Sequence, residues 1–483
     1  MEKIKMDKVK KAVPYILAGL ICLVDAIAVF SNSVELDEAY SIVLVRSSLQ
    51  DIVRGAAKDV HPPLYYLILK IASFLGGESL LKYRLVTALA TWLNLFLLGA
   101  GMIRRRWGMR VSVFYMLWFG INYCTLEKSV LVRMYSWGAF FVTAAALFVL
   151  AYYETGKIRN FILSVFLTIA AMYTHYYAVM AVFVIWIMLL TATLINKRKM
   201  VRQVLFGGVL IAAGYLPWMG SLFSQSSRVA QDYWIKNFDW WEWFSAPASL
   251  MESSLTGIGM ALYFFVFAVL ILAIFRKNGM AVCCFGVFAG TMLIGALLSI
   301  FVTPIWQSRY LYVAWGMLSL GIAIIAGQNR DKISLLLQGF LLVILCMTGV
   351  FSVMNMRKDE LMTSTADEWV AFLQENVAAG DCLIVDDPYE HSVVFQYYLP
   401  HAEIVMTEEL EEMGGPKKLG DILSGARGKG LWYVIDYVQP RFGIEKMEES
   451  VEKEGYSLHS YASYTIKYKD LEVFGIGEES YEK

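Results

Sequence analysis

The chain has 483 residues, of which 58% are hydrophobic and only 17% are charged. Its mean hydropathy of +0.53 excludes a soluble globular protein of this length and predicts a membrane protein with many spanning helices. The formal net charge of +0 hides an asymmetry, because the residues from Glu360 onward include about 25 acidic and about 10 basic side chains.

The first apolar run, Val13 to Phe30, follows a lysine-rich N-terminus. It is long enough to cross a bilayer. It is too long for a signal-peptide core, and no small-residue cleavage site follows it, so we expect a retained spanning helix. The adjacent acids Asp37 and Glu38 come shortly after this run and should lie near the membrane surface. A solvated loop would also contain such a pair, so a catalytic role depends on the rest of the chain.

A second polar motif, Asp59-Val-His-Pro-Pro-Leu-Tyr-Tyr66, also leads directly into apolar sequence. That apolar run, Leu64 to Leu75, is too short to cross and should lie in the interface or dip into the membrane. An acidic pair and a His-Pro-Pro turn beside the membrane suggest the rim of a cavity that opens at its surface. This motif contributes His61 to the candidate site.

Hydropathy predicts about eleven membrane spans of roughly 17–22 residues each. Basic clusters, such as Arg104-Arg105-Arg106 and Lys197-Arg198-Lys199, all fall on alternate connections. The positive-inside rule places these connections in the cytoplasm. We therefore expect a multi-pass plasma-membrane protein with a cytoplasmic N-terminus and an extracytoplasmic C-terminal domain. The approximate spans are 13–31, 80–103, 109–125, 136–154, 160–174, 177–195, 203–223, 257–275, 280–302, 310–327 and 333–354.

The connections on the other side hold the unusual polar motifs, which predicts one site built from several loops. Arg133 and Arg309 lie where the positive-inside rule disfavours arginine, so we expect each to have an anionic partner. The alternatives are an aromatic belt for the tryptophans, a helix-end histidine for His175 and snorkelling anchors for the arginines. Besides Asp37-Glu38 and His61, the motifs are Glu127, Arg133-Met-Tyr135, Thr174-His-Tyr-Tyr177, the aromatic loop 232–243 and Trp306-Gln-Ser-Arg-Tyr310.

After Phe351 the sequence becomes polar and acidic, and helical and strand patterns alternate. We expect a division into a membrane module, 1–355, and a small α/β domain with a mainly parallel sheet, 356–483. Asp386 and Asp387 end the first strand, where ligands often bind in such sheets, but no Gly-rich phosphate loop accompanies them, which favours a structural role. The predicted elements are a helix at 365–377, a strand at 381–387, a helix at 390–398, strands at 402–406 and 429–436, and a closing strand pair at 456–474.

The motifs together resemble those of bacterial GT-C glycosyltransferases. The segments that carry the resemblance are the acidic pair, His-Pro-Pro-Leu-Tyr-Tyr, Arg-Met-Tyr, Thr-His-Tyr-Tyr, Tyr215-Leu-Pro-Trp218 and Ser-Arg-Tyr, in this order along the chain. More narrowly, the chain resembles the family 39 group, which contains relatives of protein O-mannosyltransferases and of the aminoarabinose transferase that modifies lipid A. The resemblance covers roughly residues 10–355. Those relatives usually carry a Gln-Glu pair just before Arg-Met-Tyr, where this chain has Val130-Leu131, and Glu127 lies further upstream.

The resemblance implies a GT-C fold and an inverting transfer of a sugar from a polyprenyl-phosphate donor to an extracytoplasmic acceptor, which is a protein, a cell-wall polymer or a lipid. The acceptor hydroxyl needs a general base, for which Asp37 is the candidate. Glu38 would share that role, orient the acceptor or help to hold a divalent cation. The leaving lipid phosphate needs cationic donors, and the candidates to bind it are His61, Arg133, His175, Arg309 and Tyr310.

Two other classes of function fit parts of the sequence. A transporter or flippase of lipid-linked sugars should place ionisable residues near the membrane midplane, in paired halves with broken spans. In this chain the polar groups gather at one end of the predicted spans, which favours an enzyme over a transporter. A membrane-anchored binding or sensor protein would need only its C-terminal domain for ligand binding.

Overall fold

The structure is a computed structural model that divides into two compact units. The first contains Met1–Phe30 and Val45–Met354, and the second contains Ser31–Leu44 and Asn355–Lys483. The described residues are 2–28, 34, 36–76, 79–231, 235, 237–250, 257–328, 331–340, 342–343, 368–387, 392–426, 428–438, 440–466 and 469–478.

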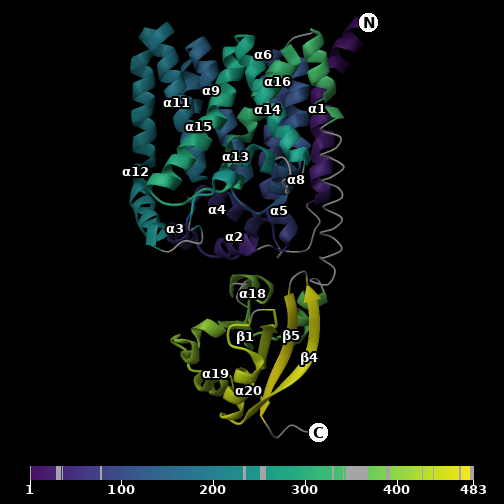
Figure 1. Ribbon diagram of the computed structural model, residues 1–483, viewed down its shortest axis with the longest axis vertical. Coiled ribbons are helices and arrows are strands. Elements are labelled where there is room, and N and C mark those ends of the chain that lie inside the picture. Colours follow the sequence, from purple (N-terminus) through teal and green to yellow (C-terminus); the bar gives the residue numbers. More distant parts are fainter. Residues whose placement is uncertain are drawn as a thin grey trace. The chain divides into compact units, whose positions relative to one another are not determined.

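The first unit is built from helices (Figure 1). In a bilayer a helix satisfies its own backbone hydrogen bonds, which is why long apolar sequences adopt this form. The helices, of which α2 crosses the boundary between the two units, are α1 (Glu2–Ala28), α2 (Leu36–Arg46), α3 (Leu49–Lys58), α4 (Leu64–Leu69), η1 (Lys70–Leu75), α5 (Leu80–Leu93), η2 (Asn94–Ile103), α6 (Arg104–Trp107), α7 (Met109–Gly120), α8 (Tyr123–Val130), α9 (Tyr135–Thr155), α10 (Ile158–Met172), α11 (Tyr176–Asn196), η3 (Arg198–Met200), α12 (Val201–Gln231), α13 (Trp240–Ser249), α14 (Gly257–Phe275), α15 (Gly279–Phe301), η4 (Ser308–Ala314) and α16 (Trp315–Gln328).

Several of these helices have the length and composition of membrane spans. Among the described residues, six are long and apolar enough to cross, and four shorter apolar helices accompany them. The prediction of an α-helical polytopic membrane protein is thereby confirmed. In the predicted span at 333–354, residues 333–340 and 342–343 are helical, and the other residues of this span lie outside the described part of the chain. The six long helices are Leu80–Trp107, Tyr135–Thr155, Tyr176–Asn196, Arg198–Gln231, Gly279–Phe301 and Ser308–Gln328, and the shorter ones are Ala12–Ala26, Leu64–Leu75, Ile158–Met172 and Phe264–Phe275.

The helix Ser308–Gln328 forms the centre of this unit. Its apolar window is 100% buried, whereas the window in Arg198–Gln231 is only 28% buried and faces the surroundings. Close packing requires a glycine at one contact, because a Cβ at Gly316 would collide with the hydroxyl of Thr143 on α9. The centrally buried helix carries η4, and with it Tyr310, into the interior of the unit.

The predicted span 109–125 is divided in the structure. Helix α7 ends at Gly120 and α8 begins at Tyr123, because Asn122 caps the second helix. The Asn122 side chain accepts a hydrogen bond from Thr125 N at 3.0 Å and donates to the carbonyl oxygens of Trp118 and Phe119 at 2.9 Å. These bonds satisfy backbone groups at the end of one helix and the start of the next. The apolar run 109–125 therefore forms the end of one helix and the start of another.

The second unit contains a five-stranded sheet with the order β2-β1-β3-β5-β4. The strands β1 (Cys382–Asp386), β2 (Glu403–Met406) and β3 (Leu431–Asp436) are parallel, and β5 (Lys469–Glu478) runs antiparallel to β3 and to β4 (Tyr456–Ile466). This confirms the predicted small α/β domain, but the sheet is mixed and not mainly parallel, because two of its four strand pairings are parallel and two are antiparallel. The helices are 368–376, α18 (Ser392–Tyr398), α19 (Leu419–Gly425) and α20 (Ile444–Glu452), with the short turns η5 (Thr407–Glu409) and η6 (Glu411–Met413).

Helices cover both faces of the central strands. Cys382 and Ile384 of β1 pack toward α19 and α20, and Leu383 and Val385 pack toward Trp369 and α18. Burial on both faces explains why β1 reads as a continuous apolar run instead of an alternating one. All five residues of β1 are buried.

Residues 31–44 belong to the second unit by their contacts, although they follow the first membrane span in sequence. The backbone N–H of Val34 donates a hydrogen bond to the Tyr398 hydroxyl of α18 at 3.2 Å. Asp37 and Glu38 form the first turn of α2, shortly after Val34. The segment that carries the candidate catalytic acids is therefore in contact with the C-terminal sheet domain.

Candidate functional site

Four segments that are distant in sequence bring the predicted polar residues together in the first unit. His61 precedes α4, Arg133 lies in the turn between α8 and α9, His175 begins α11, and Tyr310 lies in η4. All four side chains are at least nine-tenths buried, with 3–7% of each residue exposed. We name these four residues the His–Arg cluster.

Local sequence places the turn that contains His61 next to the turn that contains His175. Pro62 and Pro63 prevent a helix from running through the motif, and α4 starts directly after them. The first helical residue, Leu64, donates its N–H to the carbonyl oxygen of Tyr173 at 2.9 Å. The turn before α4 is thereby tied to the turn before α11, which is why His61 and His175 meet.

A hydrogen-bond contact between Arg133 and His61 and several ring contacts join the residues of the cluster. Arg133 Nη2 lies 3.2 Å from His61 Nε2. The ring centroids of His61 and His175 are 5.4 Å apart, and those of His175 and Tyr310 are 5.2 Å apart. Tyr135 packs on both His175 and Tyr310, at 5.7 and 6.3 Å. Two imidazoles and a guanidinium are thus buried together among tyrosine rings.

His175 contributes a hydrogen-bond donor to the cluster. Its Nδ1 accepts the backbone N–H of Tyr177 at 3.1 Å, so the proton of the neutral ring is on Nε2. Nε2 has no hydrogen-bond partner among the described residues. His175 precedes the membrane-spanning helix α11, and burial, together with the neighbouring His61, Arg133 and Arg309, lowers its pKa well below 6.5. The ring is therefore a neutral donor at physiological pH.

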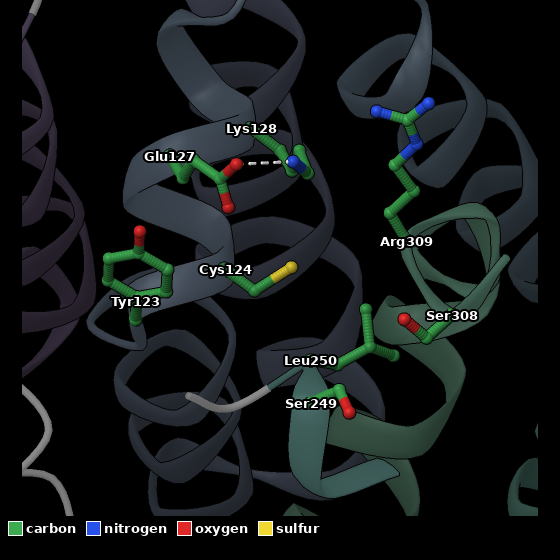
Figure 2. A pocket seen from close by; sticks show the side chains of 8 residues that line it. All are labelled: Tyr123, Cys124, Glu127, Lys128, Ser249, Leu250, Ser308 and Arg309. Atoms are coloured by element: carbon green, nitrogen blue, oxygen red, sulfur yellow. Dashed lines mark hydrogen bonds and ion pairs between the residues drawn. The ribbon is translucent and has the colours of Figure 1, made fainter. Parts of the chain in front are cut away.

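Arg309 connects the cluster to a cavity of about 240 Å³. Its guanidinium carbon lies 5.6 Å from the centroid of the Tyr310 ring. Figure 2 shows Arg309 on one side of this cavity and the pair Glu127 and Lys128 on the other. We name it the α8 pocket; its lining residues are Tyr123, Cys124, Glu127, Lys128, Ser249, Leu250, Ser308 and Arg309.

Glu127 and Lys128 form an ion pair in the wall of the α8 pocket. Lys128 Nζ and Glu127 Oε1 are 2.5 Å apart, and the two side chains are 7% and 40% exposed. Burial alone would lower the pKa of Lys128, but the Glu127 carboxylate raises it above its ordinary value. The lysine is therefore charged. Its ammonium also lies 5.5 Å from the centroid of the Tyr135 ring, next to the His–Arg cluster.

The two acids predicted to act in catalysis lie in the second unit, at the start of α2. Glu38 is buried and Asp37 is half-buried. The backbone carbonyl of Asp37 accepts a hydrogen bond from the Ser41 hydroxyl at 2.9 Å, as expected within a helix. The prediction that Asp37 shares a cavity with His61 and Arg309 stays a prediction. Among the described residues, no group of three or more His, Cys, Asp or Glu side chains could hold a metal ion.

The α8 pocket adds residues that the sequence alone did not single out. Lys128 follows Glu127 in a connection on the predicted outer side. A basic residue on that side is unusual, so its position could have indicated a functional role, as it did for Arg133. Ser249, Leu250 and Ser308 carried no such signal. Ser308 is placed by a contact from outside the pocket, since its N–H donates to Glu242 Oε1 at 2.8 Å.

The sequence matches no family model and no curated protein. Solved structures are similar. The crystal structure of ArnT from Cupriavidus metallidurans in the apo state superposes with a TM-score of 0.59 at 11% identity, over 95% of this chain and 97% of that one. The structure of the same protein bound to undecaprenyl phosphate gives a TM-score of 0.60 at 11% identity, over 96% and 97%.

The chain has the fold of ArnT. The resemblance to GT-C glycosyltransferases is thereby confirmed at the level of the fold. The ArnT fold covers nearly the whole chain, so it includes the C-terminal sheet domain as well as the membrane helices. The roles of individual residues within this fold are proposals that rest on the geometry of the site.

Proposed function

We propose that this chain is an integral membrane glycosyltransferase that moves a sugar from a polyprenyl-phosphate donor to an extracytoplasmic acceptor. The observation that carries the proposal is the His–Arg cluster, which gathers hydrogen-bond donors for an anion inside a membrane protein with the ArnT fold. ArnT binds undecaprenyl phosphate in one of the similar structures, which supports a lipid phosphate as the anion.

In the proposed reaction, the acceptor hydroxyl attacks the anomeric carbon as the bond from that carbon to the phosphate oxygen breaks. Asp37 takes the proton of the acceptor hydroxyl. The leaving polyprenyl phosphate gains negative charge, which Arg133, Arg309 and the Nε2–H of His175 stabilise, together with His61. A single displacement of this kind inverts the configuration at the anomeric carbon. Tyr310 forms the wall between the arginine of the pocket and the histidines of the cluster.

The proposal is tested with the purified full-length chain in liposomes. Radiolabelled sugar on polyprenyl phosphate should pass to acceptors in an extract of the cell envelope, and mass spectrometry of envelope glycans should show a missing sugar after deletion of the gene. Movement of the donor across the bilayer without any transfer would instead identify the chain as a transporter. Failure to bind or use any polyprenyl-phosphate sugar would contradict the proposed function.

A further inference from the structure

A buried glutamine on α12 lies beside the end of α3. Only 28% of the apolar window of the helix 198–231 is buried, but Gln225 within this helix is 2% exposed. Figure 1 shows the C-terminal part of α12 next to α3. A buried amide is costly unless its donor and acceptor atoms are paired. The partners of Gln225 therefore show which parts of the chain it holds together.

Gln225 joins the start of α11 to the end of α3 through a chain of hydrogen bonds. The Trp218 Nε1–H donates to the Tyr176 hydroxyl at 3.1 Å, and that hydroxyl donates to Gln225 Oε1. Gln225 Nε2 donates to the carbonyl oxygen of Ala56 at 2.8 Å. Because an indole N–H can only donate and a backbone carbonyl can only accept, the direction of every bond in the chain is fixed.

The carbonyl group of Ala56 belongs to the last turn of α3. The last carbonyl groups of a helix have no partner within it, and α12 supplies partners for two of them here. The second is Ala57, whose carbonyl oxygen accepts a hydrogen bond from Arg228 Nη2 at 2.8 Å. Helix α3 ends at Lys58, three residues before His61. The contact with α12 therefore sets where the turn that contains His61 begins.

The segments 56–64 and 173–176 are thereby tied together at both of their ends. Each segment carries one histidine of the His–Arg cluster, His61 in the first and His175 in the second. A backbone hydrogen bond of 2.9 Å joins residues 64 and 173, and Gln225 joins residues 56 and 176. Without Gln225 only one tie remains, and the separation of 5.4 Å between the two imidazole centroids is less well fixed.

We propose that Gln225 is a positioning residue of the phosphate site, which holds His61 and His175 at the spacing that binds the lipid phosphate. It acts through α3 and through Tyr176. Donors that are already held in place bind an anion more tightly, because less conformational freedom is lost on binding. The inference rests on the proposed function and adds to it a residue of α12.

The test measures binding of a fluorescent polyprenyl phosphate to the full-length chain in lipid nanodiscs. Gln225→Met keeps the length of the side chain but removes both of its hydrogen bonds, so it should weaken binding about 10-fold. Tyr176→Phe removes the bond to the start of α11 and keeps the bond between Gln225 and Ala56. It should weaken binding about 3-fold.

A double-mutant cycle separates positioning from a general loss of stability. If Gln225 acts through His61, then Gln225→Met should weaken binding by less than about 2-fold when His61→Ala is already present. A general loss of stability would instead multiply the effects of the two substitutions.

Gln203→Met provides a matched control on the same helix. Gln203 also accepts a hydrogen bond from a tyrosine, the Tyr152 hydroxyl, at 3.0 Å. It lies about 30 Å along α12 from Gln225, at a rise of about 1.5 Å per residue. Gln203→Met should therefore leave binding of polyprenyl phosphate unchanged.

Three outcomes overturn the inference while the proposed function stands. They are binding by Gln225→Met at the parent affinity, an undiminished loss in the His61→Ala background, and a loss in Gln203→Met as large as that in Gln225→Met. If Gln225→Met does not fold, Tyr176→Phe takes its place in the cycle, and the same outcomes decide. A parent that does not bind polyprenyl phosphate contradicts the proposed function itself, and the inference fails with it.

Discussion

His175 should remain a neutral Nε2–H donor at a pH at which a free imidazole is mostly charged. Its Nδ1 is occupied by the N–H of Tyr177, and burial beside other cationic groups lowers its pKa. Below about pH 6.5 the unfolded chain takes up a proton at this position that the folded chain excludes. Because of this proton uptake at His175, the free energy of unfolding decreases as the pH falls.

The measurement is nitrogen NMR of the full-length protein with labelled histidines. The signal that disappears in His175→Gln belongs to His175, and at pH 6 it should have the shifts of a neutral ring with the proton on Nε2. A protonated ring at pH 6, or a proton on Nδ1, would contradict the assignment of His175 as a neutral donor.

Asp37 is the predicted general base, and its replacement by asparagine keeps the shape of the side chain but removes the charge. We expect Asp37→Asn to lower the turnover number by about 10²–10⁴-fold and to leave donor binding nearly unchanged. Glu38→Gln should reduce turnover less if Glu38 orients the acceptor, and comparably if both acids hold a metal ion. The measurement is sugar transfer by purified variants in lipid.

Asp51→Asn provides a matched control, because Asp51 is an exposed acid whose ion-pair partner is the surface residue Arg54. It should turn over as the parent does. An Asp37→Asn enzyme that works at the parent rate would transfer the role of base to Glu38 or to Asp239, which caps α13.

The sequence predicted the members of the His–Arg cluster better than those of the α8 pocket. His61, Arg133, His175 and Tyr310 could be grouped because each lies in a connection on the same predicted side, and their chemical types fit an anion. Ser308 carries no comparable pattern, since its place depends on Glu242 of α13. Such contacts between distant elements arise from tertiary packing, which hydropathy does not contain.

At the scale of elements, Asp386 shows how one carboxylate fixes a loop. It is fully buried at the end of β1. It accepts the backbone N–H groups of Arg441, Phe442 and Gly443 at 2.8–3.1 Å. These bonds hold the segment that leads into α20. The expected structural role of this strand-end acid fits these contacts.

The variant Asp386→Asn should loosen this loop. Asparagine has one acceptor oxygen in place of two, and its NH₂ group would face backbone donors. We expect a loss of about 2–3 kcal/mol in local stability, so the amides of 441–443 should exchange about 30- to 150-fold faster in hydrogen–deuterium exchange. Asp421→Asn, an exposed acid in the first turn of α19, should leave exchange unchanged. Equal exchange in both variants would show that the carboxylate does not hold the loop.

The break between α7 and α8 marks the limit of prediction at this scale. The apolar run 109–125 predicted one span, because its hydropathy is continuous. The structure ends α7 early because the single polar side chain of Asn122 caps the next helix. An asparagine in an apolar run indicates a possible cap, but only packing decides whether the helix continues. Strands β1, β2 and β3 of the C-terminal domain were predicted more closely, since each is a short apolar run between turn residues.

For the whole molecule, the distribution of basic residues predicts that the C-terminal domain is extracytoplasmic. In a background without the six native cysteines, a cysteine at the exposed position Glu412 should react with a membrane-impermeant reagent in intact cells. Gly414 is less suitable, because its φ of 85° strains any other residue. A cysteine at exposed Arg198, in a predicted cytoplasmic connection, should react only after lysis. The opposite labelling pattern would show that the protein has the inverse orientation in the membrane.

The contact between Val34 and Tyr398 predicts that the C-terminal domain helps to position the proposed catalytic acids. Residues 31–44 carry Asp37 and Glu38, and their contacts group them with the sheet domain. The Val34 N–H donates to the Tyr398 hydroxyl at 3.2 Å. The substitution Tyr398→Phe removes this hydrogen bond and leaves the ring of the side chain in place. It therefore tests whether the bond holds the acids in position.

We expect Tyr398→Phe to lower the turnover number by about 3- to 10-fold, which corresponds to one hydrogen bond of about 0.5–1.5 kcal/mol. Donor binding should not change, because the residues proposed to bind the phosphate lie in the first unit. Amides of 36–44 should exchange faster in the variant. Tyr461→Phe alters a tyrosine that is 59% exposed on β4 and should affect neither quantity. Unchanged exchange and turnover in Tyr398→Phe would show that the sheet domain does not position the acids through this bond.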